Sequence, residues 1–363
     1  MLQFSPQREE MERFAEEVIP LVRVERGRYD CAMRAVRLLR LKEPLENCDV
    51  ADPRARDGEI VVDIRAAGIC HSDAHYRAGG GKVNLPLTPG HEVAGVVAGT
   101  GERVALHYLM PNGDMIGKEV DGGYAERIVV SAQNAIAIPP EVPFDQAAIM
   151  MCSTATAWHA LKLAEIRSTE SLGIIGFGGL GVSAVQLARR IGVSRIFVVD
   201  VVPEKLKMAA SFGATPVDEL PEVDVALEFS GNAAAATSAL RRLAPGGRLM
   251  IVAINLRRLE IDPYADILTR ERRIIGCADH TRDELVELME MARRREIDLS
   301  RAITRTVALD ATAINAVLDE LDRGTSHLRT IVIPSRDAVE RRATARGVGG
   351  RGRPPLHCFA ARE

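Results

Sequence analysis

A glycine-rich turn between a predicted strand and a predicted helix constrains this chain more than any other feature. The strand runs over Ser171–Ile175, and Gly176, Gly178 and Gly181 follow it with the spacing G-x-G-x-x-G. In such a turn the first glycine permits the tight bend, the second lets the backbone approach a pyrophosphate, and the third lets helix and strand pack closely. The free N–H groups at the start of the helix favour a bound phosphate. The segment therefore predicts a dinucleotide site.

An acidic residue at the end of the next strand completes this pattern. Asp200 ends the strand IFVVD, which follows the helix that Gly181 opens. A carboxylate there accepts hydrogen bonds from the adenosine ribose and repels a 2′-phosphate, and no arginine follows at once. The sequence therefore predicts NAD as the cofactor. We assign Gly179 and Leu180 of the turn, and Lys205 of the following helix, to the same cofactor site.

The order of predicted elements defines the fold class as α/β. Strands alternate with helical segments across residues 154–278, which predicts parallel βαβ units and a doubly wound Rossmann sheet. Residues 33–153 instead hold short runs rich in β-branched residues, separated by Gly, Pro and Asn, which favour a mostly-β domain. Residues 279–335 close the folded part. The expected helices cover 145–164, 181–192, 203–213, 234–247 and 283–296, and the expected strands of the second half cover 171–175, 195–200, 223–231, 248–254, 272–277 and 329–334.

Composition excludes several classes of function. Lys and Arg number 47 against 50 Asp and Glu, so the net charge of −3 gives no basic field for nucleic acid. No apolar run reaches the ~18 residues of a spanning helix, so no membrane partner is expected. Six scattered cysteines and no signal peptide predict reduced thiols and a cytoplasmic location. We interpret residues 1–32 as an N-terminal extension and residues 336–363, rich in arginine, as a disordered tail.

Three residues with soft or imidazole ligand atoms stand in suggestive settings. They are Cys70 in GICHSDAH, His91 in PGHEVAGVV and Cys152 in MMCSTATAWH. Two thiolates and one imidazole suit zinc, and three protein ligands leave a fourth position open, as in catalytic sites. The wide separation of these positions in the sequence does not by itself bring the side chains together. A small buried apolar cysteine is the alternative reading of each thiol.

Taken in order, these motifs resemble the zinc-containing medium-chain alcohol dehydrogenases of the MDR superfamily. The resemblance runs from about Met33 to Pro334 and rests on GICHSDAH, PGHEVAGVV, GKEVDGGYAERIVV, the cysteine in AAIMMCSTATAWHAL, and GFGGLG with Asp200. It implies a groES-like catalytic domain made of residues 33–153 and 279–335. The Rossmann domain, residues 154–278, is inserted between these two parts.

The resemblance also implies roles for single residues. Cys70, His91 and Cys152 match the catalytic zinc ligands, and Glu92 matches the acid beside the metal that ligates it transiently. A purely structural carboxylate remains the alternative for Glu92. Zinc acts in this family as a Lewis acid on the alcohol oxygen while the carbon releases hydride to the nicotinamide. The proton relay corresponds to Ser72 and His75.

Two neighbouring side chains have supporting roles by the same resemblance, and a third has none. Asp73 matches the carboxylate that orients His91. His71 occupies a position near the cofactor pyrophosphate. For Trp158, which follows Cys152 on the predicted helix, packing in the core is the better interpretation.

The chain departs from the family in two places. Many members carry a lobe with four cysteines for a second, structural zinc, but no cysteine lies between Cys70 and Cys152 here. The loop before the strand ERVALHY is also compressed, to Thr100 and Gly101. We therefore expect one catalytic zinc and no structural zinc.

The sequence thus predicts a zinc-dependent oxidoreductase that transfers a hydride between a small alcohol, or its aldehyde or ketone, and NAD. The resemblance favours a homo-oligomer, either a dimer or a tetramer. Three alternatives stay open: a zinc-free relative of the quinone reductase kind, a non-catalytic nucleotide-binding protein, and a product whose shortened domain folds poorly. The sequence does not identify the alcohol.

Overall fold

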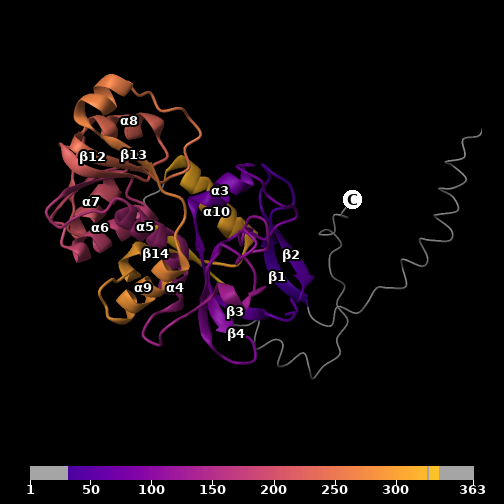
Figure 1. Cartoon of the computed structure of the whole chain (residues 1–363). Coiled ribbons are helices and arrows are strands. Elements are labelled where there is room, and N and C mark those ends of the chain that lie inside the picture. The colour runs from indigo at the N-terminus through magenta and orange to yellow at the C-terminus, as the bar shows by residue number, and fades with distance from the viewer. Residues whose placement is uncertain (1–31, 325–326, 335–363) are drawn as a thin grey trace, which may run out of the picture.

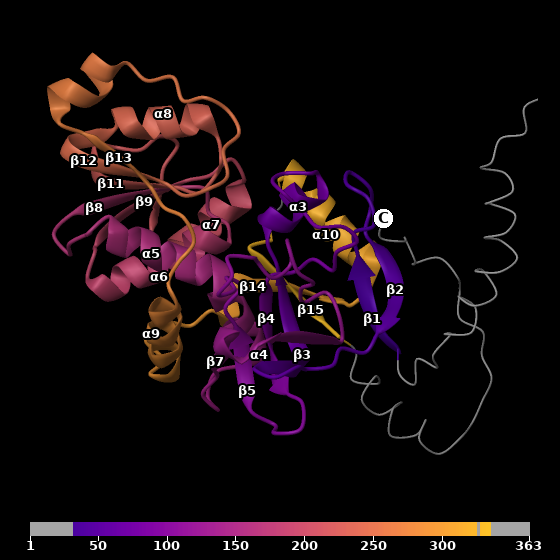
Figure 2. The same ribbon diagram turned by 45° about the vertical axis from the view of Figure 1, so that its right-hand side comes forward.

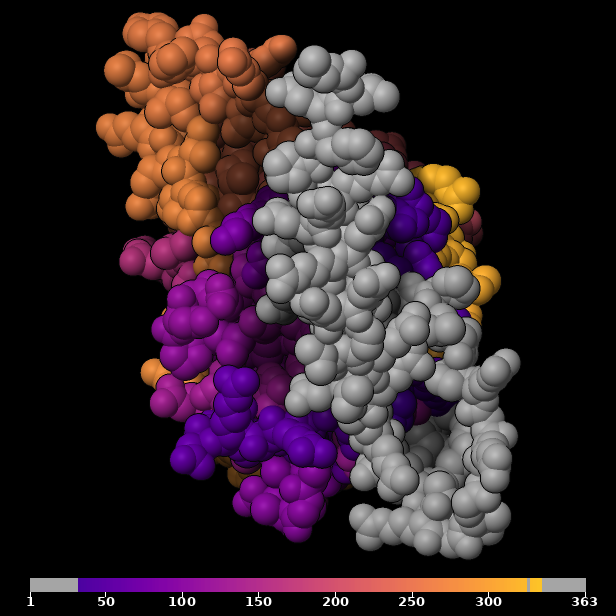
Figure 3. All heavy atoms as spheres, turned by 90° about the vertical axis from the view of Figure 1, so that its right-hand side faces the viewer, coloured from indigo at the N-terminus to yellow at the C-terminus, as the bar shows by residue number. Residues whose placement is uncertain are grey.

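The computed structural model describes residues 32–324 and 327–334, which form two lobes (Figure 1). One lobe is built on a six-stranded sheet and the other on a seven-stranded sheet. In Figure 3 the orange residues, which follow α8 (Ala233–Arg241) in the chain, gather at the upper left, apart from most of the indigo and purple residues. The expected extension, apart from Ala32, and the whole expected tail lie outside the described residues.

The six-stranded sheet is parallel throughout, with the order β10-β9-β8-β11-β12-β13. The strand order changes direction between β8 and β11, and ligands bind at the carboxyl ends of the strands beside such a point. The elements in chain order are β8 (Ser171–Ile175), α6 (Gly179–Ile191), β9 (Arg195–Val199), α7 (Pro203–Ser211), β10 (Thr215–Pro216), β11 (Val223–Glu228), α8, β12 (Leu243–Ile251) and β13 (Arg273–Gly276). This arrangement confirms the predicted Rossmann fold.

The central strand and the first helix of this lobe follow from their residues. Every residue of β8 is buried, as expected of a parallel strand that is covered on both faces. The helix α6 ends at Gly192, whose φ of 102° lies in the left-handed region that favours glycine. The turn before α6 therefore stands at a fixed place at the carboxyl end of β8.

The seven-stranded sheet joins the two ends of the described chain. Its order is β14-β15-β3-β4-β5-β7, and β6 pairs with β3. The late strand β15 is antiparallel to β3 and parallel to β14, so the C-terminal segment completes a sheet begun by the N-terminal segment. The strands are β3 (Glu59–Ile69), β4 (Glu92–Val97), β5 (Arg103–Leu106), β6 (Arg127–Ser131), β7 (Ala135–Ala137), β14 (Ile303–Ala308) and β15 (Arg329–Ile333), with β1 (Ala32–Arg37) and β2 (Glu46–Ala51) paired separately.

Helices cover the region between the lobes. In Figures 1 and 2, α3 (His71–Arg77) and α10 (Ala311–Arg323) lie side by side on the seven-stranded lobe. The segments α4 (Phe144–Ile149) and α5 (Ala155–Leu163) lead into the Rossmann lobe, where α5 packs against α6 and α9 (Arg282–Arg293). Within the described residues, no helix is both long and apolar enough to cross a bilayer.

The structure corrects several expected elements. The helix predicted over 234–247 ends at Arg241, since Pro245 lacks an N–H and Gly246 has a φ of 73°, and β12 already begins at Leu243. The strands β2 and β7 and the helices α3 and α10 were not predicted. Cys70, Cys152 and Cys277 are free, but Cys48 is disulfide-bonded, so the expectation of reduced thiols is wrong at that residue.

Candidate functional site

Four predicted metal ligands meet at one place. The ligand atoms of Cys70, His91, Glu92 and Cys152 all lie within 4.8 Å of one another. Sheet pairing accounts for the first three, because β3 and β4 are antiparallel and Gly68 lies opposite Glu92. The end of β3 and the start of β4 therefore lie next to each other, although a long connection separates Cys70 from His91 in the sequence.

The fourth side chain comes from a local break in helix geometry. The helix predicted over 145–164 is interrupted by a π-helical segment, Met150–Thr154, which contains Cys152. In this wider turn the Ser153 hydroxyl donates to the carbonyl of Ile149 at 3.1 Å, and Thr154 pairs with Ser183 at 3.0 Å. Single π-helical turns inside α-helices are frequent at functional sites. The π turn thus accompanies the placement of Cys152 beside the ligands from β3 and β4.

Asp73 holds the first ligands in position. Its carboxylate contacts Nδ1 of His91 at 3.1 Å, and it accepts the backbone N–H of Cys70 at 3.0 Å and the hydroxyl of Tyr124 at 2.7 Å. A proton on Nδ1 leaves Nε2 of His91 unprotonated and able to bind a metal. Asp73 therefore lies where it can orient His91, as the sequence resemblance implies, and its contact favours the tautomer with the proton on Nδ1.

The pKa values of the two cysteine thiols shift in opposite directions. The hydrogen bond from Cys152 lowers the pKa of Cys70 well below its usual value, against the effect of burial and with help from His91. The bond to Cys70, together with burial, raises the pKa of Cys152. Burial opposes charge on His91, but Asp73 outweighs it and raises the pKa of His91. Without a metal ion, the pocket thus favours an anionic sulfur on Cys70 beside a protonated His91.

A buried arginine, which the sequence did not single out, faces this cluster. Arg329 begins β15 and forms an ion pair with Glu92, and both side chains are almost inaccessible to solvent. Burial raises the pKa of Glu92 to about 7, while the charge of Arg329 opposes that shift. Nothing in the local sequence RTIVIP marks Arg329, since only the return of β15 to β3 brings it to Glu92.

The two residues predicted to relay a proton line a common cavity beside the predicted ligands. The oxygen of Ser72 lies 3.6 Å from Sγ of Cys70, and both Ser72 and His75 border a cavity of about 420 Å³. Burial, followed by the nearby His71, lowers the pKa of His75. The described residues give no direct hydrogen bond between Ser72 and His75. A relay between them therefore needs a third group, such as a bound hydroxyl or water.

This cavity has walls from both lobes. The wall from the seven-stranded lobe includes three of the predicted ligands, Cys70, His91 and Cys152, and also Tyr76, Tyr108 and Met115. The Rossmann lobe supplies residues at the carboxyl ends of β11, β12 and β13. Cavities at such strand ends are where α/β proteins bind their ligands. The residues at these strand ends are Phe229, Ser230, Gly231, Val252, Ala253, Ile254, Cys277, Ala278 and Asp279. His71, Thr156 and Leu180 complete the wall.

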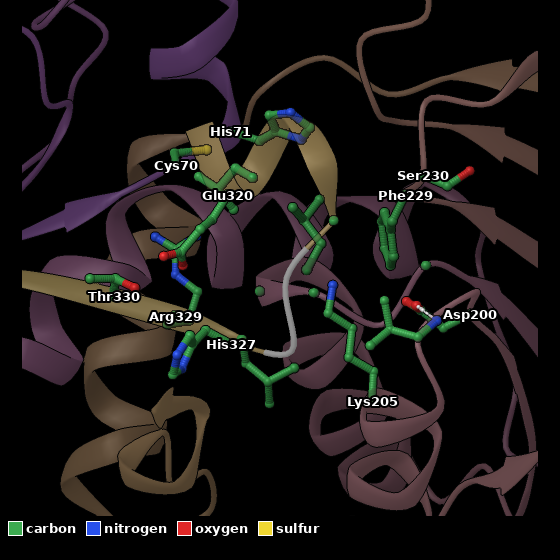
Figure 4. Close-up of a pocket in the computed structure, with 18 of the residues that line it drawn as sticks. Cys70, His71, Asp200, Lys205, Phe229, Ser230, Glu320, His327, Arg329 and Thr330 are labelled. Atoms are coloured by element: carbon green, nitrogen blue, oxygen red, sulfur yellow. Dashed lines mark hydrogen bonds between the residues drawn. The ribbon is translucent and has the colours of Figure 1, made fainter. Parts of the chain in front are cut away.

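A second cavity, of about 250 Å³, lies against the glycine-rich turn (Figure 4). Gly176 has a φ of 94°, and a Cβ on Gly181 would stand 2.5 Å from the carbonyl oxygen of Gly176. Gly178 faces open space, so a ligand can approach its backbone. Of the predicted cofactor residues, Gly176, Gly178, Gly179, Leu180, Asp200 and Lys205 line this cavity, and Gly181 packs behind the turn.

Asp200 braces the turn while it faces the cavity. Its carboxylate accepts the backbone N–H of Phe177 at 2.6 Å and that of Val202 at 2.9 Å. A carboxylate can accept about four hydrogen bonds, so two positions stay available for ribose hydroxyls. In Figure 4, Asp200 and Lys205 lie across the cavity from Cys70 and His71, so this cavity reaches the metal cluster.

His71 and Trp158, also named from the sequence, lie in different surroundings. His71 lines both cavities, stacks on His75 with 4.7 Å between ring centroids, and contacts Asp322 at 3.2 Å. Trp158 is buried in the core, as predicted, and donates its indole N–H to Glu287 at 2.8 Å. His71 thus lies where either a nucleotide or a substrate would pass.

Comparison with known proteins gives the family. Residues 56–140 match the model of the alcohol dehydrogenase GroES-like domain, and residues 179–294 match that of the zinc-binding dehydrogenases. An alcohol dehydrogenase of Geobacillus stearothermophilus is 30% identical over 341 residues, covering 83% of this chain and 98% of that protein. An NAD-dependent alcohol dehydrogenase of Sulfolobus acidocaldarius is 30% identical over 337 residues, covering 80% and 97%.

A solved structure agrees with these matches. A putative zinc-binding dehydrogenase of Sinorhizobium meliloti bound to NADP is 25% identical, with a TM-score of 0.76, and the match covers 84% of this chain and 100% of that one. The fold, the order of the motifs and the relatives all agree. The chain therefore belongs to the zinc-containing medium-chain alcohol dehydrogenase family and is an alcohol oxidoreductase.

Proposed function

We propose that this chain is a zinc-dependent, NAD-specific dehydrogenase that interconverts a small alcohol and its aldehyde or ketone. The observation that carries the proposal is the meeting of the ligand atoms of Cys70, His91, Glu92 and Cys152. Cys70 lines both cavities, and His91 and Cys152 line the larger one. One cavity borders the dinucleotide turn and the other borders the relay residues. A nicotinamide and an alcohol carbon bound in the two cavities would therefore meet beside the metal ligands.

The residues fit a zinc ion on chemical grounds. Two thiols and an imidazole are typical zinc ligands, and a set of three leaves a position for substrate. Glu92 supports the same interpretation, because its Oε1 is buried and has no hydrogen-bond partner among the described residues. We propose Cys70, His91 and Cys152 as the ligands and Glu92 as the residue that ligates transiently during exchange.

Zinc bound here would supply a Lewis acid that stabilises negative charge on the alcohol oxygen. The protein supplies the proton path. Ser72, next to Cys70 in space, accepts the alcohol proton while it donates its own to an intervening hydroxyl or water, which passes a proton to His75 and so to solvent. His75 suits this task because burial keeps it largely neutral and so able to accept a proton.

The residues also fit a dinucleotide. The helix α6 starts at Gly179 and has no side-chain cap, so its first N–H groups are available to a pyrophosphate. NAD supplies the hydride acceptor. Asp200 supports NAD over NADP, because its carboxylate would repel a 2′-phosphate. Two observations weigh toward NADP instead. Lys205 is a cation in the same cavity, and one relative, the Sinorhizobium meliloti protein, is bound to NADP.

A panel of alcohols, assayed separately with NAD and NADP by the absorbance of the reduced cofactor, tests this function. We expect turnover with NAD at a kcat/KM at least tenfold above that with NADP. A chelator should abolish turnover and added Zn²⁺ should restore it. Turnover that survives complete metal removal would favour a zinc-free reductase, and NADH binding without turnover of any alcohol would favour a non-catalytic nucleotide-binding protein.

Native mass spectrometry tests metal content and assembly together. We expect one zinc per chain, since the chain has no cysteines between Cys70 and Cys152 for a structural site. We also propose a dimer or tetramer, because β13 is an edge strand of the Rossmann sheet and Ile274 on it is 37% exposed. Two zinc ions per chain, or a monomer at micromolar concentration, would contradict the respective proposal.

The cellular location stays a prediction. The sequence favours the cytoplasm, because it shows no secretory signal and only scattered cysteines. Cell fractionation with an antibody against the chain decides between a cytoplasmic and an exported protein.

A further inference from the structure

The substrate cavity contains an acidic residue that the proposed chemistry does not use. Asp279 follows β13, at the carboxyl end of the parallel sheet, and lines the same cavity as Ser72 and Cys152. Its backbone has a φ of 53°, in the left-handed region, where Asp and Asn are tolerated far better than most residues. The backbone thus aims a short polar side chain from the Rossmann lobe at the cavity.

A hydrogen bond across the two lobes holds this carboxylate in place. The hydroxyl of Tyr108, from the segment after β5, donates to Oδ1 of Asp279 at 2.7 Å. The ring of Tyr108 also packs edge-on against His91, with 5.3 Å between centroids. Tyr108 therefore spans the distance from a proposed metal ligand to Asp279. Oδ2 of Asp279 keeps its lone pairs, because no described residue donates to it.

No cation neutralises Asp279. Among the described residues it forms no salt bridge, whereas Glu170, a partly buried carboxylate of the same lobe, pairs with Arg248. Of the imidazoles that pack on Tyr108, His91 is paired with Asp73 and not with Asp279. His280, which is 5% exposed, is neutral, because burial lowers its pKa to about 3. The cavity wall thus presents an unpaired negative acceptor.

We propose that Asp279, positioned by Tyr108, is a specificity-determining residue that binds a hydrogen-bond donor on the substrate beyond the reacting carbon. This inference rests on the proposed function. The favoured substrates are alcohols with a second hydroxyl or an ammonium group close to the carbinol. Plain aliphatic alcohols leave the carboxylate unsatisfied, and hydroxy acids place a like charge beside it, which disfavours both classes.

Matched substrates of similar size test this proposal on the zinc-loaded enzyme with NAD. Butan-2-ol is compared with butane-2,3-diol, with 1-aminopropan-2-ol and with 3-hydroxybutanoate. We expect kcat/KM to be at least about tenfold higher for the diol or the amino alcohol than for butan-2-ol, the equivalent of ~1.4 kcal/mol. The two donor-bearing substrates distinguish a hydroxyl preference from a preference for a cation. The hydroxy acid should be the poorest substrate.

The variant Asp279→Asn isolates the carboxylate. Asn fits the left-handed backbone and its Oδ1 can still accept from Tyr108, so the fold and the melting temperature should be retained. We expect the preference for the donor-bearing substrate over butan-2-ol to fall about tenfold or more, mainly through KM. Asp218→Asn, an exposed residue with the same loss of charge, should leave the preference unchanged. Tyr108→Phe should weaken the preference in the same direction as Asp279→Asn.

Two outcomes overturn the proposal, and they differ from failure of the proposed function. The first is wild-type turnover of butan-2-ol as good as that of the diol and the amino alcohol. The second is a preference that is unchanged in Asp279→Asn while the melting temperature is retained. If the wild-type enzyme turns over no alcohol at all, the dehydrogenase function itself fails.

Discussion

Replacing Cys70 by Ser should reduce kcat/KM for alcohol oxidation by about a thousandfold or more. A serine hydroxyl stays protonated at neutral pH, so the site loses one of its two sulfur ligands and most of its affinity for zinc. Loss of Lewis-acid stabilisation is worth several kcal/mol in the transition state, and about 4 kcal/mol corresponds to a factor of a thousand. Steady-state kinetics and the zinc content of the same sample measure this loss.

The dinucleotide site provides the internal control for Cys70→Ser. The glycine-rich turn and Asp200 belong to another lobe, so NADH affinity, measured by fluorescence, should change little. Cys277→Ser is the matched variant, because Cys277 is also free and buried but lies outside the group of four ligands. It should retain its zinc. A Cys70→Ser enzyme with full zinc content and wild-type turnover would show that Cys70 is not a ligand.

Replacing Arg329 by Met should destabilise the zinc-free protein by about 3–5 kcal/mol, because the change leaves Glu92 buried without its counter-charge. Removing one partner of a buried ion pair has a cost of this size. Met keeps much of the arginine volume, so the effect comes from charge rather than from a cavity. Urea unfolding in the presence of a chelator measures the free energy of unfolding without a contribution from bound metal.

A double variant separates this electrostatic effect from lost packing. Glu92→Gln combined with Arg329→Met removes both charges, so it should be more stable than Arg329→Met alone. Arg248→Met is the comparison for a less buried pair, since Arg248 contacts Glu170 at 2.9 Å with part of both side chains exposed, and it should cost less. If the double variant is no more stable than Arg329→Met, the Glu92 charge is not the cause.

The Rossmann half of the fold could be predicted from the sequence because its signals are local. The strand Ser171–Ile175, the glycine turn, the helix after it and Asp200 occupy one short stretch, and each has a direct backbone reason. The helix α10 was not predicted, although its residues Val317, Glu320 and Leu321 line the dinucleotide cavity.

The metal cluster could be proposed from the sequence only by resemblance to a family. Spacing alone did not predict that β3 and β4 pair so that Cys70 meets His91, nor that a π-helical segment carries Cys152. Arg329 had no signal at all, because its role depends on β15, near the end of the described chain, returning to β3 near its start. Long-range pairing of this kind is set by tertiary packing, which local propensity does not encode.

X-ray absorption spectroscopy at the zinc edge gives the sharpest test of the proposed metal site, because it counts the atoms bound to the metal. We expect one zinc per chain with about two sulfur neighbours at ~2.3 Å and the remaining nitrogen or oxygen neighbours at ~2.0–2.1 Å. The Cys70→Ser variant should lose a sulfur neighbour or the metal itself. Zinc that is bound in full but without sulfur neighbours would contradict the proposed site.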